Sequence, residues 1–257
     1  MKKTVFISGL HRSGTSILHR IVSTSGEVTG FENTGAIEDE GQLLQTVFEP
    51  ASTYGGPGKF AFDPQARLNE KSTLINDANR QKLNEEWGKY WDPTKTIRVE
   101  KSPPNLIRTR FFQGMYPDAY FITIIRHPIA VSYATQKWSK TSLDDLIRHW
   151  IAAYEIYQED RGRLERELTF SYEEMTHNDA EIIRQVESFL GITIAYHNQL
   201  TDKNSRYFER WKKNEWWQFV KKNNYKRIVE KYETAVNQFG YSLVDLEKYP
   251  SMIPQIA

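Results

Sequence analysis

The 257-residue sequence contains no cysteine, and its 34 basic and 33 acidic side chains leave a formal net charge of only +1. The absence of cysteine excludes disulfides and thiolate-bound metals, and it fits a reducing compartment. The near-zero charge provides no global basic field that would point to nucleic acid. Long apolar runs are also missing. The apolar run near the N-terminus, residues 5–7, is far too short for a signal segment or a membrane span. We therefore expect a cytoplasmic protein with neither a nucleic-acid nor a membrane partner.

A further absence concerns the stretch "GLHRSGTS" at residues 9–16. It has the glycine spacing of a phosphate-binding loop, but Thr15 stands where an ATP-binding loop carries lysine. The backbone N–H groups of such a loop curl around a phosphate at the start of the next helix, whose dipole adds to the attraction. Arg12 supplies the charge of the missing lysine, and Thr15 and Ser16 offer hydroxyl groups. The stretch predicts an anion site that is not an ordinary ATP site.

Strand-like and helical patterns alternate along the chain, which predicts an α/β fold of three layers with helices flanking a central parallel sheet. We treat residues 1–257 as a single domain. Strands are expected at residues 5–8, 96–99, 119–126 and 168–172. Helices are expected from Gly14, after Pro103-Pro104 as far as Phe111, from Pro128, from Ser142, over residues 182–190, and from Val220 to Phe239.

Four strand ends carry polar segments, which read "HRSGTS", "EKSPPN", "RHP" and "SYEE". Ligands of parallel sheets bind beyond the carboxyl ends of the strands, so these segments predict one common site. The strand at residues 119–126 ends in Arg126, where an NTPase would place a magnesium-binding aspartate. A cation there repels a metal and attracts a second anion. The site is thus expected to hold two separated anionic groups with no metal between them.

These segments resemble those of sulfotransferases that use 3′-phosphoadenylyl sulfate (PAPS). "GLHRSGTS" is similar to the 5′-phosphosulfate loop of that family, and "IIRHPIAVSYA" is similar to its 3′-phosphate strand and helix. "FSYEEM" resembles the Tyr-Glu-Asp-Leu segment, and "EKSPPN" resembles the Lys-x-Pro segment of the protein-tyrosine and carbohydrate branches. All four occur in the family's order, between about residues 6 and 175. The resemblance implies a P-loop-like fold, PAPS as donor, the bisphosphate PAP as product, and no required metal.

The resemblance also implies which residues bind the nucleotide. Arg126 would bind the 3′-phosphate. The family usually carries a serine at the position of Ala134, so either Ser132 replaces it or the helix begins differently. A C-terminal helical part, about residues 179–257, would complete the nucleotide site, with Lys212 as a further candidate. The predicted cofactor-binding residues are Arg12, Ser13, Gly14, Thr15, Ser16, Arg126, Ser132, Tyr172, Ser205 and Tyr207.

The same resemblance points to catalytic candidates. Lys101 matches the lysine of the Lys-x-Pro segment, and its charge would stabilise the bridging oxygen as the sulfuryl group leaves. Pro103 stands where the cytosolic branch places its catalytic histidine, so a base must come from elsewhere. Glu32 lies within a residue of the glutamate base of the tyrosylprotein branch, and a carboxylate buried beside a sulfonate has a raised pKa that suits it to accept a proton. Its rivals are Glu38, Asp39 and Glu40. His11 and Arg12 complete the catalytic set, and His11 either bonds the sulfonate or caps the loop.

Residues 32–64 are expected to form the acceptor pocket, with residues 55–58 as a mobile lid. In this stretch acidic residues precede the aromatic residues Tyr54, Phe60 and Phe62. Such a pocket suits a small, partly apolar acceptor molecule with a hydroxyl or amine group, and a positive charge on this molecule is one option. Both a monomer and a homodimer are compatible with the sequence. The rival functions are a nucleotide kinase or NTPase, a non-catalytic protein that binds PAP, and an interaction protein.

Overall fold

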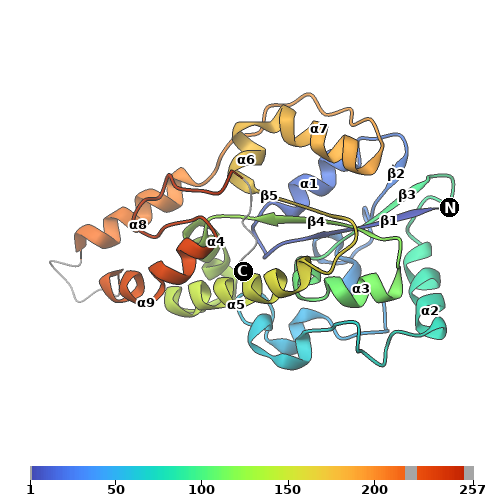
Figure 1. The fold of residues 1–257 in the computed structure, drawn as a ribbon, viewed down its shortest axis with the longest axis horizontal. Coiled ribbons are helices and arrows are strands. Elements are labelled where there is room, and N and C mark those ends of the chain that lie inside the picture. Colours follow the sequence, from blue (N-terminus) through green and yellow to red (C-terminus); the bar gives the residue numbers. More distant parts are fainter. Residues whose placement is uncertain (1, 218–224, 252–257) are drawn as a thin grey trace.

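A five-stranded parallel sheet lies at the centre of the computed structural model, which describes residues 2–217 and 225–251. The strand order is β2-β3-β1-β4-β5, and each neighbouring pair is parallel. Helices cover both faces of the sheet (Figure 1), which confirms the predicted three-layer α/β fold. The strands are β1 (Lys3–Ser8), β2 (Val28–Thr29), β3 (Ile97–Lys101), β4 (Tyr120–Ile125) and β5 (Glu167–Ser171).

The predicted helices are present, and the described residues form three further helices, α2, α6 and α8, that were not predicted. Ser142 caps α5 as expected, because its hydroxyl accepts a hydrogen bond from the backbone N–H of Asp145. Val220, which was assigned to the last helix, lies outside the described residues. The helices are α1 (Thr15–Val22), α2 (Asp77–Gly88), α3 (Thr109–Met115), α4 (Pro128–Ser139), α5 (Leu143–Arg161), α6 (Tyr172–His177), α7 (Asp179–Leu190), α8 (Ser205–Trp217) and α9 (Tyr225–Gln238).

The central strands are buried on both faces, as their near-continuous apolar runs predict. In β1 the side chains of Val5 and Ile7 pack with those of α1 and α7 on one face. Phe6 points to the other face, where its ring stacks on that of Phe112 of α3. The alternation fixes the register of β1 between β3 and β4, so the carboxyl ends of all three strands reach the same edge.

Two local predictions differ from the structure. Pro103 begins a short 3-10 helix (Pro103–Ile107) rather than the start of α3, because Arg108 leaves the helical conformation and its buried side chain donates to the carbonyls of Glu49 and Ala66. Residues 49–64, where no helix was expected, contain two short 3-10 helices packed against the core, Ala51–Tyr54 and Phe60–Phe62. Phe60 is fully buried there, since so large an apolar ring gains more by packing than by exposure. That residues 55–58 act as a mobile lid stays a prediction.

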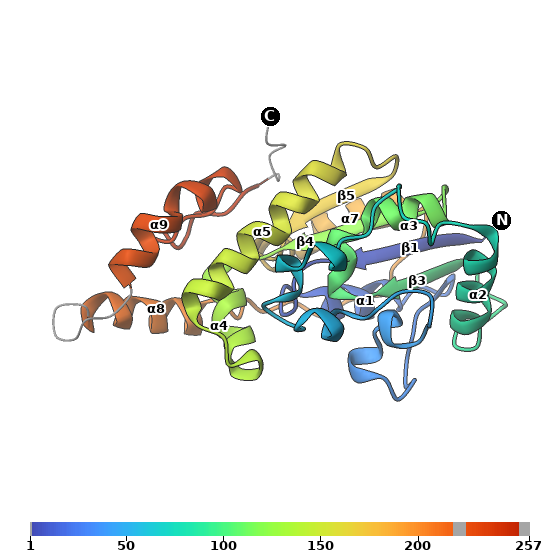
Figure 2. The ribbon, with the colours of Figure 1, turned by 90° about the horizontal axis from the view of Figure 1, so that it is seen from below.

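Helices α8 and α9 lie beyond the carboxyl edge of the sheet (Figures 1 and 2). Helix α8 packs against α4, and α9 packs against α5. This arrangement brings the N-terminus of α8 to the edge where β4 and β5 end. In residues 2–217 and 225–251, no helix combines the length and apolar character that crossing a bilayer requires. That the whole chain forms one domain stays a prediction.

Candidate active site

The glycine-rich loop between β1 and α1 has a backbone that requires glycine at two positions. Gly9 has a φ of 146°, and a Cβ atom there would lie 2.4 Å from the carbonyl oxygen of Ile124. Gly14 has a φ of 109°, and a Cβ atom there would lie 3.0 Å from the ring of Tyr172. The loop can therefore approach the ends of β4 and β5 closely. Because its cap residue Gly14 has no side chain, the N-terminus of α1 stays available to an anion.

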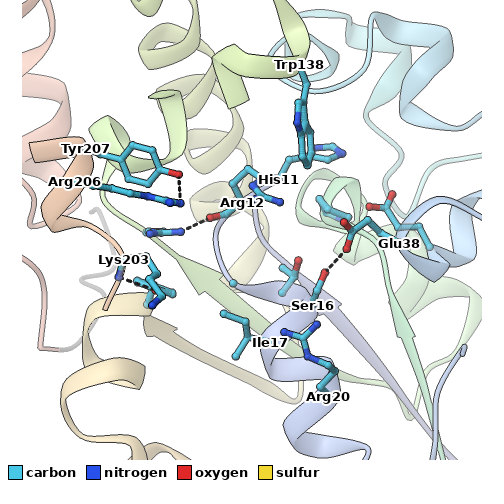
Figure 3. Close-up of a pocket in the computed structure, with 16 residues that line it drawn as sticks. His11, Arg12, Ser16, Ile17, Arg20, Glu38, Trp138, Lys203, Arg206 and Tyr207 are labelled. Carbon is cyan, nitrogen blue, oxygen red and sulfur yellow. Dashed lines mark hydrogen bonds between the residues drawn. The ribbon is translucent and has the colours of Figure 1, made fainter. Parts of the chain in front are cut away.

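A cavity of about 310 Å³ opens at this edge of the sheet. Figure 3 shows Ser16 and Glu38 on one side of it, Arg206 and Tyr207 on the opposite side, and Arg12 between them. Gly14 and Thr15 of the loop also line it. The cationic side chains in the lining outnumber the carboxylates, so the cavity attracts anions. These cationic residues are Arg12, Arg20, Arg126, Lys203 and Arg206.

Arg126 follows β4 and is held tightly at the far side of the loop. Its side chain is only 7% exposed, and its guanidinium lies 3.9 Å from the centre of the Tyr172 ring. Nη1 donates to the carbonyl oxygen of Arg12 at 2.8 Å, and Nε donates to Oδ1 of Asn204 at 2.8 Å. The buried Nη2 has no hydrogen-bond partner among the described residues. An anion in the cavity is the natural partner for this nitrogen.

Helix α8 and the residues before it form one wall of the cavity. Tyr207, a predicted cofactor-binding residue, lines the cavity together with Arg206 and Lys203, which sequence reasoning did not select. Ser205 and Lys212 are exposed and lie outside the lining. The N–H of Lys203 donates to the Tyr172 hydroxyl at 3.3 Å, which ties this wall to the end of β5. Helix α8 therefore reaches the cavity through Arg206 and Tyr207, whereas the candidates Ser205 and Lys212 do not.

Lys101 ends β3 and lies directly behind the cavity wall. The side chain is buried, and Nζ donates to the carbonyl oxygen of Glu38 at 2.6 Å. Nζ also lies 4.0 Å from Oε1 of Glu40, which lines the cavity. Burial raises the pKa of Glu40, while the nearby Lys101 charge opposes that rise. A buried lysine and a buried carboxylate with a raised pKa thus meet at the edge of the anion-attracting cavity.

The other acidic candidates have different surroundings. Glu32 is exposed and does not line the cavity. Asp39 accepts hydrogen bonds from the hydroxyl of Thr34 and from the N–H groups of Thr34 and Asn33, and these bonds lower its pKa against the opposing effect of burial. Glu38 does line the cavity, where its carboxylate accepts a hydrogen bond from the hydroxyl of Ser16 at 3.2 Å. The structure thus brings Glu38 and Glu40 to the site and leaves Glu32 outside it.

His11 lines both this cavity and a second, much smaller one. Its pKa is lowered to about 3, first by burial and then by the charges of Lys101 and Arg12, so the ring is neutral. The smaller cavity also contains Ser132, which was predicted to bind the 3′-phosphate. Ser132 is 1% exposed and is absent from the lining of the larger cavity, because α4 turns it towards α5.

Ser13 also faces away from the larger cavity. It is fully buried, and its hydroxyl lies 3.4 Å from that of Tyr154. Its N–H donates to the carbonyl oxygen of Leu10 at 3.0 Å, which closes the turn of the loop. Ser13 therefore supports the loop from behind, although the sequence resemblance grouped it with the nucleotide-binding residues.

The expected aromatic walls of the acceptor pocket are placed elsewhere. Tyr54, Phe60 and Phe62 do not line the larger cavity, and Phe60 instead packs its ring edge against His11 from behind. The aromatic side chain at the opening is Trp138, near the end of α4. It is 55% exposed, and the Arg12 guanidinium lies 4.6 Å from the centre of its ring. No sequence signal marks Trp138, since it only reaches the loop once α4 has packed against the sheet.

Arg20 also lines the cavity without having been selected from the sequence. Its position one turn along α1 from Ser16 places it on the same side of the helix as the loop hydroxyls. That i, i+4 spacing could have identified it. Within residues 2–217 and 225–251, no group of three or more histidine or acidic side chains is arranged to hold a metal ion.

Comparison with known proteins gives a consistent picture. The family model described as "Sulfotransferase family" matches residues 4–196. Protein-tyrosine sulfotransferase 2 of Gallus gallus is 22% identical over 215 residues, which are 77% of this chain and 55% of that protein. The chain thus spans about half the length of this curated relative.

Solved structures of similar arrangement include two further sulfotransferases. The sulfotransferase from Alicyclobacillus acidocaldarius is similar over 92% of this chain and 96% of its own, with 15% identity and a TM-score of 0.47. Mouse sulfotransferase SULT7A1 complexed with PAP is similar over 83% of this chain and 66% of its own, with 12% identity and a TM-score of 0.45.

Proposed function

Because this chain belongs to the sulfotransferase family, we propose that it transfers a sulfuryl group from PAPS to a hydroxyl or amine of a small molecule. The observation that carries the proposal is the pairing of two cationic ends in one cavity. The glycine loop with Arg12 forms one end, and Arg126 with its unpartnered Nη2 forms the other. This arrangement fits a nucleotide with a 5′-phosphosulfate at the loop and a 3′-phosphate at Arg126.

The residues around the loop would stabilise the charge that develops during transfer. The loop N–H groups, Thr15 and Arg12 would hold the non-bridging oxygens. Lys101 would neutralise the charge on the phosphate oxygen from which the sulfur departs, leaving PAP. For this, Lys101 would have to exchange its present contact with the Glu38 carbonyl for that oxygen. The neutral His11 ring could donate one hydrogen bond to the sulfonate without adding charge.

We assign the role of general base to Glu40. As the acceptor oxygen or nitrogen forms its bond to sulfur, Glu40 would take the proton that this atom loses. Its position in the cavity lining and its raised pKa both support this role. Glu32, the first choice from sequence spacing, is exposed and lies outside the lining.

The acceptor would enter between Trp138 and Glu38. An exposed indole ring and a carboxylate at the opening favour a small molecule with an apolar part, and a positive charge on it would add to the attraction. Arg20 at the same opening would select against a strongly cationic acceptor, so we propose at most a single positive charge. The lack of cysteine supports a cytoplasmic setting for this reaction.

A thermal-shift experiment tests the nucleotide preference. PAP at ~100-fold excess over its dissociation constant should stabilise the chain by about 2.7 kcal/mol, with and without EDTA. ATP should stabilise it much less. Stabilisation by magnesium-ATP alone would favour the kinase or NTPase alternative. Tight PAP binding without transfer from radiolabelled donor to any of a panel of neutral, cationic and anionic acceptors would favour the non-catalytic alternative.

A further inference from the structure

Asn204 stands at the N-terminus of α8, yet its side chain does not cap that helix. Its carbonyl oxygen accepts the N–H groups of Tyr207 at 2.8 Å and Phe208 at 3.1 Å, which is the backbone pattern of a cap residue. An asparagine at this position ordinarily turns its side chain back to the helix N–H groups. Here the side chain points into the protein and Asn204 is only 1% exposed. Its amide therefore serves another purpose.

That amide bridges two buried charged side chains. Oδ1 accepts a hydrogen bond from Nε of Arg126 at 2.8 Å, and Nδ2 donates to Oε1 of Glu173 at 2.6 Å. A guanidinium can only donate and a carboxylate accepts, so one orientation of the amide satisfies both partners. Aspartate, leucine or alanine at this position could not make both bonds.

The bridge restricts the orientation of the Arg126 guanidinium beside the cavity. With Nε held by Asn204 and Nη1 held by the carbonyl oxygen of Arg12, the guanidinium is fixed on the face of the Tyr172 ring. Nη2 is then the nitrogen left for a ligand, and it is buried without a partner among the described residues. Rotation of the guanidinium would break two hydrogen bonds. The orientation needed to bind an anion is therefore built before the anion arrives.

The other end of the bridge is anchored equally well. Glu173 is 4% exposed, and its carboxylate also accepts hydrogen bonds from the N–H of His127 at 3.1 Å and from the hydroxyl of Tyr241 at 2.9 Å. Asn204 thus connects α8 to residues that follow β4 and β5 and to the segment after α9. Lys203 and Arg206, which lie close to Asn204 in the sequence, line the cavity with cationic side chains. Movement of α8 would therefore change the positions of these charges in the cavity.

We propose that Asn204 is a positioning residue, which holds Arg126 in its anion-binding orientation and thereby couples binding of a 3′-phosphate to the docking of α8. The identity of the anion rests on the proposed function, whereas the coupling between Asn204 and Arg126 does not. Neither the helix pattern nor the sequence resemblance singled out this asparagine.

The test measures affinities of the full chain for PAP and for adenosine 5′-monophosphate, which lacks the 3′-phosphate. In Asn204→Ala the affinity for PAP should fall about tenfold, as expected for loss of one hydrogen bond to a charged group, while that for the monophosphate should change less than about twofold. Asn204→Asp should weaken PAP binding further, because a carboxylate there would neutralise Arg126 and face Glu173. Asn198→Ala, an exposed asparagine earlier in the same segment, is the matched control and should leave both affinities unchanged.

Hydrogen exchange and a ligand-free double-mutant cycle complete the test. PAP should slow hydrogen exchange of the α8 backbone amides in the wild-type chain and in Asn198→Ala. In Asn204→Ala this protection should be smaller. Without ligand, the melting-temperature shifts of Asn204→Ala and Arg126→Ala should not add in the double variant. Equal losses of both nucleotides, or additive shifts, would overturn the proposal. If the wild-type chain does not prefer PAP, the proposed function fails, and the ligand-free cycle still decides the coupling.

Discussion

Nζ of Lys101 lies 4.0 Å from Oε1 of Glu40, and both side chains are buried beside the glycine loop. The two residues come from the end of β3 and from a connection 61 positions earlier in the sequence. The lysine charge counteracts the rise in the pKa of Glu40 that burial causes. In the proposed reaction, Lys101 would supply the cation for the departing phosphate oxygen and Glu40 the carboxylate for the acceptor proton. The following predictions separate these two roles.

Replacement of Lys101 should affect turnover far more than nucleotide binding. Lys101→Ala should lower kcat roughly 100- to 1000-fold with PAP affinity changed little, because the charge matters most as the sulfur–oxygen bond breaks. Lys101→Arg, which keeps the charge, should retain more activity than Lys101→Ala. Steady-state kinetics together with calorimetric titration of PAP measure both quantities. A loss confined to PAP affinity would place Lys101 in binding instead.

Replacement of Glu40 should remove the pH dependence of kcat/KM on the acidic side. If Glu40 accepts the acceptor proton, wild-type kcat/KM falls as the pH drops through the pKa of its carboxyl group, which burial raises. Glu40→Gln should lower kcat roughly 100-fold or more and flatten this acidic limb.

Glu32→Gln provides the comparison, since Glu32 is exposed and outside the cavity. It should keep the wild-type rate and pH profile. The reverse pattern, with Glu32→Gln impaired and Glu40→Gln active, would return the base to the position that sequence spacing favoured.

Arg126→Ala should separate the two ends of the nucleotide. Loss of its charge-assisted hydrogen bond should cost about 1.5–3 kcal/mol for PAPS or PAP, or roughly 10- to 100-fold in affinity. Adenosine 5′-phosphosulfate, which has no 3′-phosphate, should bind almost as well as to the wild-type chain. Competition titrations with both ligands check this. Equal weakening of both would show that Arg126 does not bind the 3′-phosphate.

Glu100 should make the stability of the fold depend on pH. Burial raises the pKa of its carboxyl group from 4.5 to about 7, against hydrogen bonds from Ser102 and Asn105. The folded state therefore holds this proton more tightly than the unfolded state, so the contribution to stability is complete below pH ~4.5 and is lost as the pH rises through about 7. The full effect is on the order of 3 kcal/mol at ~1.4 kcal/mol per pKa unit.

Glu100→Gln cannot ionise, and its amide can bond both neighbours. Urea unfolding at several pH values should show this variant gaining stability relative to the wild-type chain between pH ~4.5 and ~7. A constant difference across that range would mean that Glu100 titrates normally in the folded state.

Much of the fold and part of the site followed from local sequence patterns. The continuous apolar run of β4 predicted a strand buried on both faces, and Gly9 and Gly14 predicted a loop that only glycine can form. Both features leave a local mark in the sequence, an apolar run or a glycine spacing, so a short stretch is enough to recognise them. Helix α2 was missed because it carries little amphipathic pattern, with only Leu83 and Trp87 buried.

The sequence alone determined the parallel sheet, the glycine-rich loop and the presence of Arg126 at a neighbouring strand end. Only the tertiary structure decided which polar residues reach the cavity: Glu40 rather than Glu32, and Lys203 and Arg206 rather than Ser205. The reason is that a side chain on a loop or a helix terminus can point to either side, and its local sequence does not determine which. That direction depends on contacts with distant residues, such as those between Lys101 and the Glu38 carbonyl or between Arg126 and Asn204.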